Sequence, residues 1–340
     1  MLATLTIGLL TAASDAAAAA EFVFDPDDPP TPQCHASTIV ETPTGLVAAW
    51  FGGTREKDPD VGIYLSRRTD SAWSRPARVF DGSEGGEEHT ACWNPVLFRP
   101  DGGPLMLFYK VGRTPAEWHG MLATSTDDGR TWSEPRRLGS DERLEDPNAA
   151  LIGPVKNKPV ALPGGDLLAP SSSEHDGWRL HFERSADGGR TWDVVGPIES
   201  DLQAIQPSIL FHPGGRLQAI ARTRKARRLA TTWSEDAGRS WAPPTLLDLS
   251  NPNAGTDAVT LRDGRHLLVF NPLSRGRQRL AVAVSADGVV WETVRTLEDG
   301  RPGDEFSYPA VIQTSDDTVH VTYTWQRRSI RHVAFPPPAD

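Results

Sequence analysis

An eight-residue segment that recurs at nearly constant spacing limits the fold of this chain more than any other feature. It has the pattern Ser-x-Asp-x-Gly-x-Thr/Ser-Trp at residues 125–132, 185–192 and 234–241. A shortened copy occupies residues 285–291, and a degenerate copy ends at Trp73. The tryptophans of successive copies are 59, 60, 49 and 50 residues apart. Repeats of this length predict a propeller or solenoid whose units have room for four short strands each.

Each copy of the octapeptide has the chemistry of a tight hairpin turn. Its Ser and Asp side chains can accept hydrogen bonds from backbone N–H groups of the turn, and its Gly supplies a positive φ. The Trp can then fill the wedge between neighbouring units. The segment lacks the alternating carboxylates and the distal Glu of an EF-hand calcium loop. We therefore expect these turns to be scaffold, without a direct part in catalysis.

A second pattern precedes each octapeptide and recurs once more after the last one: a polar residue, an apolar strand, a Gly- or Asp-rich turn and another strand. Six residues open such strands: His35, Asn94, Lys158, Gln206, Asp257 and Tyr308. The sequence therefore predicts an all-β fold, a single six-bladed β-propeller over residues 21–336. Residues 330–335 are expected to form the third strand of the last blade. Residues 21–24 are expected to return as the strand that closes the ring and covers its open edge.

The charge of the chain limits its partners. It has 340 residues, a formal net charge of −10 and a sequence pI near 5.4. Nucleic acids and anionic membrane surfaces require a basic face on the protein that binds them. Neither is expected as a partner.

Residues 1–20 are typical of a secretory leader, because an apolar stretch ends in small residues with a cleavage site after Ala20. Asp15 interrupts the apolar stretch, which is also too short for a membrane span. This interpretation predicts a secreted or periplasmic protein. If the segment is instead a tail or follows a misassigned start, the protein is cytoplasmic.

Propeller geometry brings the six strand entrances together. The first strand of each blade lines the central channel, so the residues at its entrance face one funnel. The residues that close each second strand are expected on the same face: Arg55, Lys110, Glu174, Arg222, Arg224, Asn271 and Arg327. This ring is largely cationic inside an acidic chain. Because Arg binds carboxylates through two parallel hydrogen bonds, the ring predicts an anionic, carboxylate-bearing sugar as the ligand.

Two histidines near blade entrances, His35 and His89, are candidates for general acid–base catalysis, since histidine titrates near neutral pH. Together with Cys34 and Cys92 they also suggest a zinc site. Adjacent residues of a strand point to opposite faces, however, and the spacing is not that of a zinc finger. We therefore predict no metal and no cofactor. Two cysteines do not make a disulfide framework. Cys34 and Cys92 can form one bridge if they are exported and adjacent, and otherwise they are buried free thiols, which we expect.

The complete octapeptides resemble the Asp boxes of sialidases and of other Asp-box (BNR) repeat proteins. The segments CHASTIVE (34–41), WFGGTRE (50–56) and SYPAVIQ (307–313) are similar to bacterial predicted neuraminidases. The resemblance extends over residues 33–333 and implies a sialidase-like propeller with Asp-box hairpins. Asp boxes are specific for the fold and not for the reaction.

In sialidases, three arginines hold the substrate carboxylate, a Tyr–Glu pair supplies the nucleophile and an Asp is the acid–base residue. The resemblance implies that Tyr308 is the nucleophile, and it leaves the helper of Tyr308 open between Glu305 and Glu174. It implies an acid–base residue at Asp58 or Asp60. The arginines that match the family pattern are Arg55, Arg222 and either Arg277 or Arg279.

The chain departs from this family at the start of the first blade. Sialidases have an arginine in a Phe/Tyr-Arg-Ile-Pro motif there, and this chain has Cys-His-Ala-Ser at residues 34–37.

Three functions stay open. The first is an exo-glycosidase that releases a terminal acidic sugar, with Tyr308 attacking. The second is a polysaccharide lyase or unusual glycosidase acting on uronate-containing glycans, in which His35, His89 or Tyr308 moves protons. The third is a non-catalytic glycan-binding propeller.

Overall fold

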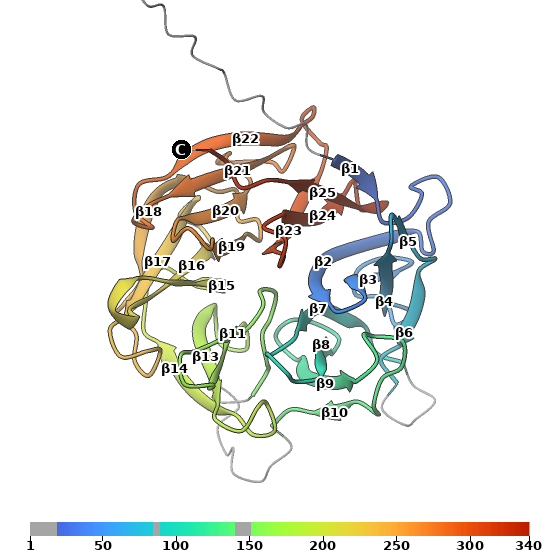
Figure 1. Ribbon diagram of the computed structural model, residues 1–340, viewed down its shortest axis with the longest axis horizontal. Coiled ribbons are helices and arrows are strands. Elements are labelled where there is room, and N and C mark those ends of the chain that lie inside the picture. The colour runs from blue at the N-terminus through green and yellow to red at the C-terminus, as the bar shows by residue number, and fades with distance from the viewer. Residues whose placement is uncertain (1–18, 84–88, 140–150, 340) are drawn as a thin grey trace, which may run out of the picture.

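Six antiparallel sheets surround a common axis in the computed structural model of the protein (Figure 1). The structure describes residues 19–83, 89–139 and 151–339. No α-helix occurs within these ranges, and their one helical element is a short 3-10 turn, η2 (Pro213–Gly215). The same ranges hold no helix that is long and apolar enough to cross a membrane. The predicted six-bladed, all-β propeller is confirmed.

In blades one to five the strands follow one another in sequence order, with the first strand nearest the axis (Figure 1). In blade six, a strand from the start of the described chain is added to the last three strands. Blade one contains β2 (Gln33–Thr42), β3 (Gly45–Gly53), β4 (Gly62–Thr69), β5 (Ala72–Trp73) and β6 (Ala77–Phe80). Blade two contains β7 (Cys92–Phe98), β8 (Leu105–Val111), β9 (His119–Ser125) and β10 (Arg136–Arg137). Blade three contains β11 (Val160–Ala161), β12 (Leu167–Ser173), β13 (Arg179–Ser185) and β14 (Asp193–Ile198). Blade four contains β15 (Ala204–Phe211), β16 (Leu217–Thr223), β17 (Arg228–Ser234) and β18 (Thr245–Ser250). Blade five contains β19 (Asp257–Thr260), β20 (His266–Phe270), β21 (Arg279–Ser285) and β22 (Glu292–Asp299). Blade six contains β23 (Phe306–Gln313), β24 (Val319–Trp325), β25 (Ser329–Phe335) and β1 (Ala19–Phe22).

Blade six is completed by the other end of the described chain. Strand β1 pairs antiparallel with β25, from Ala19 opposite Ala334 to Phe22 opposite Arg331. The predicted third strand and closing strand are therefore both present, although the closing strand starts before the predicted Glu21. The pairing covers the edge of β25, which would otherwise be open to another chain. Most of the predicted leader, residues 1–18, lies outside the described residues.

A row of polar side chains connects this closing strand to blades six and one. His320 Nδ1 lies 2.9 Å from His332 Nε2, and His332 Nδ1 lies 2.9 Å from a carboxylate oxygen of Glu21. Arg68 in β4 donates from Nε to the same oxygen at 2.7 Å. Burial lowers the pKa of His320 to about 4, and burial also lowers the pKa of His332. The two histidines are therefore neutral in the folded protein at neutral pH.

We expect the protein to lose stability as the pH falls from about 6.5 to about 4. In this window the histidines of the unfolded chain bind protons, whereas His320 and His332 in the fold resist them. The free energy of unfolding should fall by at most about 1.4 kcal/mol per pH unit for each histidine. Chemical denaturation at about pH 7.5 and about pH 5 measures the effect, and His320→Gln should lose less stability between the two than the wild type. If the wild type and His320→Gln lost the same free energy of unfolding between the two pH values, His320 would not cause the loss of stability.

The octapeptide turns join the third and fourth strands of blades two to five, on the outer side of each blade. In the first of them, Gly129 donates its N–H to Ser125 Oγ at 2.9 Å. Asp127 accepts the N–H of Thr131 at 2.8 Å and its hydroxyl at 2.6 Å. These hydrogen bonds hold the pKa of Asp127 well below its ordinary value. The Ser, Asp and Thr side chains of the motif are thus used inside the turn, as expected for scaffold.

The tryptophans of the octapeptides pack against the preceding blade. Trp192 of blade three meets Phe108 of blade two edge-on, with ring centroids 5.9 Å apart. Trp241 of blade four stacks on Phe182 of blade three at 3.9 Å. Large aromatic rings thus fill the wedge that opens between radiating sheets.

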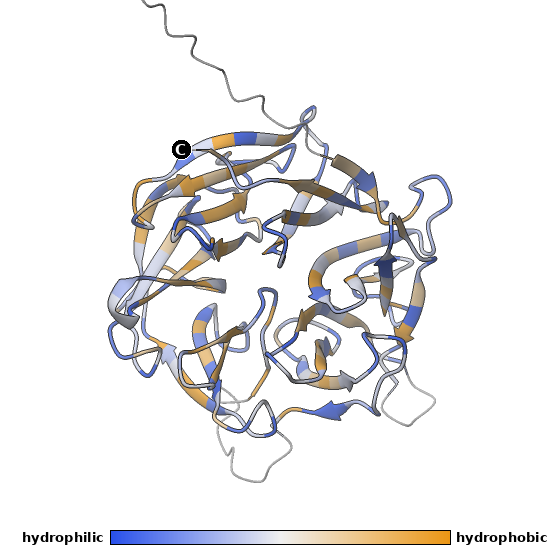
Figure 2. Ribbon diagram, viewed as in Figure 1, coloured by the Kyte–Doolittle hydropathy of each residue, from blue (hydrophilic) through white to orange (hydrophobic). Residues whose placement is uncertain are grey.

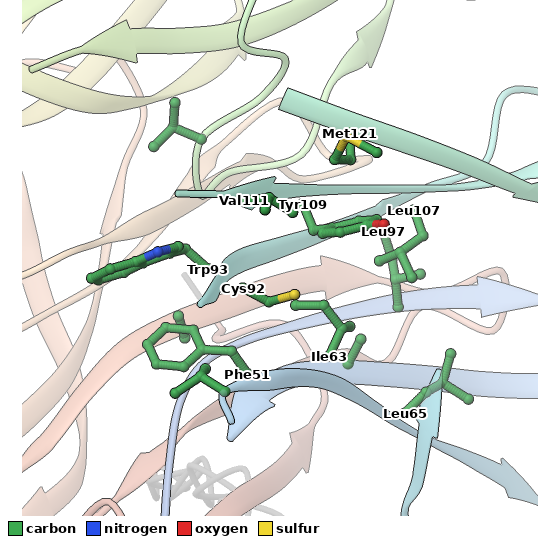
Figure 3. Packing of buried hydrophobic residues seen from close by; sticks show 14 of the residues in the cluster. Phe51, Ile63, Leu65, Cys92, Trp93, Leu97, Leu107, Tyr109, Val111 and Met121 are labelled. Carbon is green, nitrogen blue, oxygen red and sulfur yellow. The ribbon is translucent and has the colours of Figure 1, made fainter. Parts of the chain in front are cut away.

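Apart from the two-residue β11, the inner strands are largely buried, because each blade is packed between two others. Strand β8 is buried along its whole length, and β7 along nearly all of it. Figure 2 shows hydrophobic residues along the strands and hydrophilic ones in many of the turns. Figure 3 shows the layer between blades one and two, where Phe51 and Ile63 pack against residues of β7 such as Cys92. Cys34 and Cys92 are buried free thiols, as predicted, and burial raises the pKa of both.

Candidate active site

Four inner strands carry the same irregularity near their first residues. Pairing with the second strand of the blade shifts register after His35, Trp93, Ile205 and Ser307. The residue that follows has a positive φ in each case: Ala36 (56°), Asn94 (33°), Gln206 (57°) and Tyr308 (53°). Such a bulge interrupts the ladder and re-aims a side chain. Positive φ strains residues other than glycine, and strain of this kind is concentrated at functional sites.

The bulges place three of the predicted entrance residues at equivalent positions, namely Asn94, Gln206 and Tyr308. In blade one the equivalent residue is Ala36 and not the predicted His35. His35 nevertheless reaches the axis, because its side chain contacts Tyr308.

Tyr308 lies at the centre of a cluster to which several blades contribute. Its ring centroid is 4.2 Å from that of His35 in blade one. The guanidinium carbons of Arg222 in blade four and Arg277 in blade five lie 5.4 and 5.5 Å from the same ring. Lys156 Nζ is 5.9 Å from it. The cluster therefore presents a phenol surrounded by cations, in a chain whose net charge is negative.

Glu305 connects Arg277, which lies beside Tyr308, to Arg327. It accepts from Arg277 at 2.9 Å and from Arg327 at 3.0 Å, and the Ser307 hydroxyl donates to it at 2.8 Å. Burial alone would raise the pKa of the Glu305 carboxyl, but Arg327 and Arg277 hold it below its ordinary value. Arg327 also donates to Glu56 at 2.6 Å. Glu305 is thus an ionised carboxylate fixed within the cluster.

Arg222 differs from the other two arginines in its partners. Its Nη1 donates to the carbonyl oxygen and to Oδ1 of Asn253, at 3.0 and 3.1 Å. Its guanidinium lies 4.9 Å from the ring of Trp178, and only 7 % of the residue is exposed. Among the residues that the structure describes, no carboxylate forms an ion pair with it and its Nε has no hydrogen-bond partner. Arg222 is therefore the buried cation best placed to receive an external carboxylate.

Glu174 lies in the turn between β12 and β13, on the side of Arg222 and Trp178. Burial raises the pKa of its carboxyl, although Arg222 and the Trp178 indole partly oppose that effect. A carboxyl of this kind keeps its proton to higher pH than an exposed one, which suits a general acid.

His35 is buried, with 3 % of its surface exposed, and its Nδ1 lies 2.9 Å from Thr324 Oγ1. Burial and the positive charges of Arg327, Arg277 and Arg222 lower its pKa well below the ordinary value. The imidazole is neutral at neutral pH and can accept a proton.

Lys158 does not contact Tyr308 among the residues that the structure describes, and it bonds to another predicted strand entrance instead. Its Nζ donates to Asp257 at 2.9 Å and to the Ala258 carbonyl at 3.3 Å. The Asp257 carboxylate also accepts the Ser208 hydroxyl and the Val311 N–H, so both its oxygens are used to hold blades together. Lys156, two residues earlier in the chain, contacts Tyr308 instead.

Three further predicted residues lie elsewhere. Lys110 is fully buried and donates to the Pro154 carbonyl at 2.7 Å. Arg279 is half exposed and pairs with Asp299 at 2.9 Å on the outer strands of blade five, whereas Arg277 contacts Tyr308. His89 is exposed and lies 3.8 Å from the Asp81 carboxylate. These three residues do not meet Tyr308 because their positions in the blades direct them into the core or to the surface.

The loop between β3 and β4 borders the cluster through Glu56, which accepts from Arg327. The other predicted residues of this loop bond within it. Arg55 is largely exposed and pairs with Asp58 at 3.1 Å. Asp60 accepts both the N–H and the hydroxyl of Thr54 at 2.8 Å. Asp58 and Asp60 are thus close in sequence to Glu56, which borders the cluster. Among the described residues, however, their hydrogen bonds stay within the loop and none directs them toward Tyr308.

Sequence reasoning missed several residues of the cluster: Glu56, Lys156, Trp178 and Asn253. Trp178 and Asn253 carry no signal in a strand pattern, because both lie in loops between strands. Lys156 could have been suspected from the run Lys156-Asn157-Lys158, which places two lysines before a strand.

The fold and the cluster define a class of protein: a six-bladed propeller with Asp-box turns and a cationic, tyrosine-centred site at its axis. The family profile described as "BNR repeat-like domain" matches residues 44–321. Because this match covers most of the chain, the protein belongs to the BNR repeat-like domain family.

Proteins with known names show the same relationship at low identity. The chain is 26 % identical over 234 residues to a sialidase of Bacteroides fragilis, a match that covers 63 % of this chain and 40 % of that protein. It is 24 % identical over 326 residues to an exo-alpha-sialidase of Aspergillus fumigatus, covering 82 % and 75 %. The solved structure of Hadza microbial sialidase Hz136 superimposes with a TM-score of 0.78 at 20 % identity, covering 94 % of this chain and 68 % of that chain. This last likeness supports the fold. The match thus spans less than half the length of the Bacteroides protein.

Proposed function

We propose that this protein is a retaining exo-glycosidase of the sialidase kind, which releases a terminal acidic sugar from a glycan or oligosaccharide. Tyr308 is the nucleophile. The observation that carries the proposal is the position of Tyr308, in a strained bulge at the axis with three cations around its ring. The relatives named as sialidases support the same reading.

The proposed reaction begins with the sugar carboxylate bound by Arg222, beside Arg277. Tyr308 Oη attacks the anomeric carbon, the phenol proton passes to a nearby base and the glycosidic bond breaks. The leaving oxygen takes a proton from a carboxylic acid of the site. A water molecule then attacks the anomeric carbon and gives its proton to the former acid, which now acts as base. The bond from the sugar to Tyr308 Oη breaks, and the phenol oxygen takes back its proton from the base that received it.

Glu305 and Glu174 divide the remaining roles by their protonation states. Glu305 is held ionised and lies three residues before Tyr308, so we assign it the charge that assists the phenol. Glu174 has a raised pKa, and we assign it proton donation to the leaving group. Asp58 and Asp60, the acids that the resemblance implies, would have to leave the bonds of their own loop to act.

A second candidate function is a lyase acting on uronate-containing glycans, and one observation favours it: His35 is neutral and packs against Tyr308. In that reaction His35 removes the proton next to the carboxylate, and Tyr308 donates its proton to the leaving oxygen. The product is an unsaturated uronate, and no bond forms between Tyr308 and the sugar.

A substrate screen with sialosides and uronate oligosaccharides, followed by labelling with a fluorinated sialosyl inactivator, distinguishes these functions. Release of the acidic sugar, with the label mapped to the peptide that contains Tyr308, is the expected result. An unsaturated product with Tyr308 unlabelled would establish the lyase instead. Binding of acidic sugars without turnover of any substrate would leave a non-catalytic glycan-binding propeller.

An acidic glycan outside the cell is consistent with the leader-like composition of residues 1–20. We therefore propose a secreted or periplasmic location for the enzyme.

A further inference from the structure

A buried lysine and the asparagine after it reach the axis from blade three. Lys156 and Asn157 are 3 % and 1 % exposed and lie in the segment before β11. In Figure 1 this green segment extends toward the middle of the ring. The inner strand of blade three has only two residues, Val160–Ala161. The segment therefore occupies the place that a longer first strand fills in other blades.

The Lys156 ammonium has three N–H donors, and each has an oxygen acceptor. Nζ donates to Asn157 Oδ1 at 2.9 Å, to the Thr256 carbonyl at 3.0 Å and to the Pro309 carbonyl at 2.5 Å. Asn157 Nδ2 donates to the Gln206 carbonyl at 3.0 Å. The pair thus ties blade three to blades four, five and six at one point.

Two of these carbonyls belong to the strained bulges. Gln206 is the positive-φ residue of the bulge in β15, and Pro309 follows Tyr308 in the bulge of β23. A bulge removes residues from the regular ladder, and a buried carbonyl that loses its ladder donor needs another one. Lys156 donates to the Pro309 carbonyl next to Tyr308, and Asn157 donates to the Gln206 carbonyl in blade four.

The lysine stem runs beside the tyrosine because Gly255 leaves room for both. A Cβ at Gly255 would lie 2.8 Å from Lys156 Cε and 3.3 Å from Tyr308 Cδ2. Burial lowers the pKa of Lys156 to about 7, while Asp257 opposes the effect and Lys158 and Arg222 add to it. The charge of Lys156 in turn contributes to the lowered pKa of His35, which also packs against Tyr308.

We propose that Lys156 is a positioning residue, whose ammonium fixes the bulge that orients Tyr308 without touching the substrate. An effect of Lys156 on turnover rests on the proposed function, whereas an effect of Lys156 on the order of the bulge does not.

Hydrogen–deuterium exchange of the whole protein tests the structural part without any substrate. Lys156→Met removes the three donors while keeping an unbranched apolar stem. Exchange should become faster by about 10-fold or more in the peptide that spans residues 306–311, with little change at the octapeptide turns. Unchanged exchange over 306–311 would overturn the proposal.

Lys158→Met is the matched control. Lys158 also lies before β11 and also donates to a backbone carbonyl of blade five, at Ala258. It pairs with Asp257 and has no contact with Tyr308 among the residues described. Asp257 also accepts the Val311 N–H, so Val311 is left out of this comparison. The variant is expected to lower the melting temperature while leaving exchange over 306–310 as in the wild type. If both variants loosen 306–310 equally, Lys156 is only one of several structural ties and the proposal fails.

The kinetic part is measured on the acidic glycoside that the wild type cleaves. Lys156→Met should lower kcat by about 10-fold to 100-fold with KM within about threefold, because the nucleophile is displaced while Arg222 still binds the carboxylate. A rise in KM at unchanged kcat would overturn the positioning role. If the wild type cleaves no acidic glycoside, the proposed function fails, and the exchange experiment still decides whether Lys156 orders the bulge.

Lys156→Gln provides a second variant in case Lys156→Met does not fold. The shorter amide retains N–H donors but no charge. Exchange over 306–311 should then be faster than in the wild type, and wild-type exchange in this variant would equally overturn the proposal.

Discussion

Tyr308→Phe is expected to lower kcat on an acidic glycoside by about 10³-fold or more, with the fold intact. The substitution removes only the hydroxyl that attacks the anomeric carbon and leaves the ring that packs on His35. Substrate should still bind, because Arg222 and Arg277 remain. Steady-state kinetics with calorimetric binding of the substrate measures both quantities, and the variant should give no labelled peptide with the fluorinated inactivator.

Tyr109→Phe is the matched control for this loss. Tyr109 is a second buried tyrosine, which stacks on Phe80 at 5.0 Å between blades one and two, away from the axis. It should keep wild-type kcat. If the Tyr308→Phe variant retained a tenth or more of wild-type kcat, Tyr308 would not be the nucleophile.

Arg222→Ala is expected to weaken binding of acidic sugars by about 2–5 kcal/mol, or about 30-fold to 5,000-fold in Kd. The reason is that Arg222 is buried and has no carboxylate partner in the described part of the chain, so its charge is free for the ligand. The melting temperature should change little, since its hydrogen bonds reach only Asn253. Isothermal titration with an acidic sugar and with its neutral analogue measures the effect.

Arg224→Ala is the control for charge at the same hairpin. Arg224 is exposed, donates to Gln203 and lies farther from the Trp178 ring than Arg222 does. Its loss should change binding of acidic sugars by less than about threefold. If Arg222→Ala weakened the neutral analogue as much as the acidic sugar, Arg222 would not be a carboxylate-binding residue.

The blade architecture could be predicted because its signals are local in the sequence. Ser125, Asp127 and Gly129 hydrogen-bond among neighbours within one turn, so the motif specifies the same hairpin wherever it occurs. The spacing of Trp192 and Trp241 then gives the size of a blade. The closing strand near Glu21 could also be expected, since an open sheet edge needs a partner.

The site could be predicted only where its residues follow the same local pattern. Tyr308, like Gln206, precedes a proline at a strand entrance and lies at the axis in the structure. Lys158 precedes a proline in the same way, but the inner strand of blade three is shortened, so the lysine at the axis is Lys156. Arg277 contacts Tyr308 from the loop before β21. Side chains in a loop do not alternate between two faces as they do in a strand, so the sequence could not predict where Arg277 points.

By itself, the sequence determined the fold class, the number of blades, the turns between their outer strands and the tyrosine at the centre. Those features depend on contacts between residues that are close in the chain or repeat at a fixed period. Only the tertiary structure decided which charges meet at Tyr308, since Glu305, Arg222 and Lys156 come from different blades and converge through ring closure. The charge states followed from the same convergence, because burial and neighbouring cations, rather than residue type, keep His35 neutral.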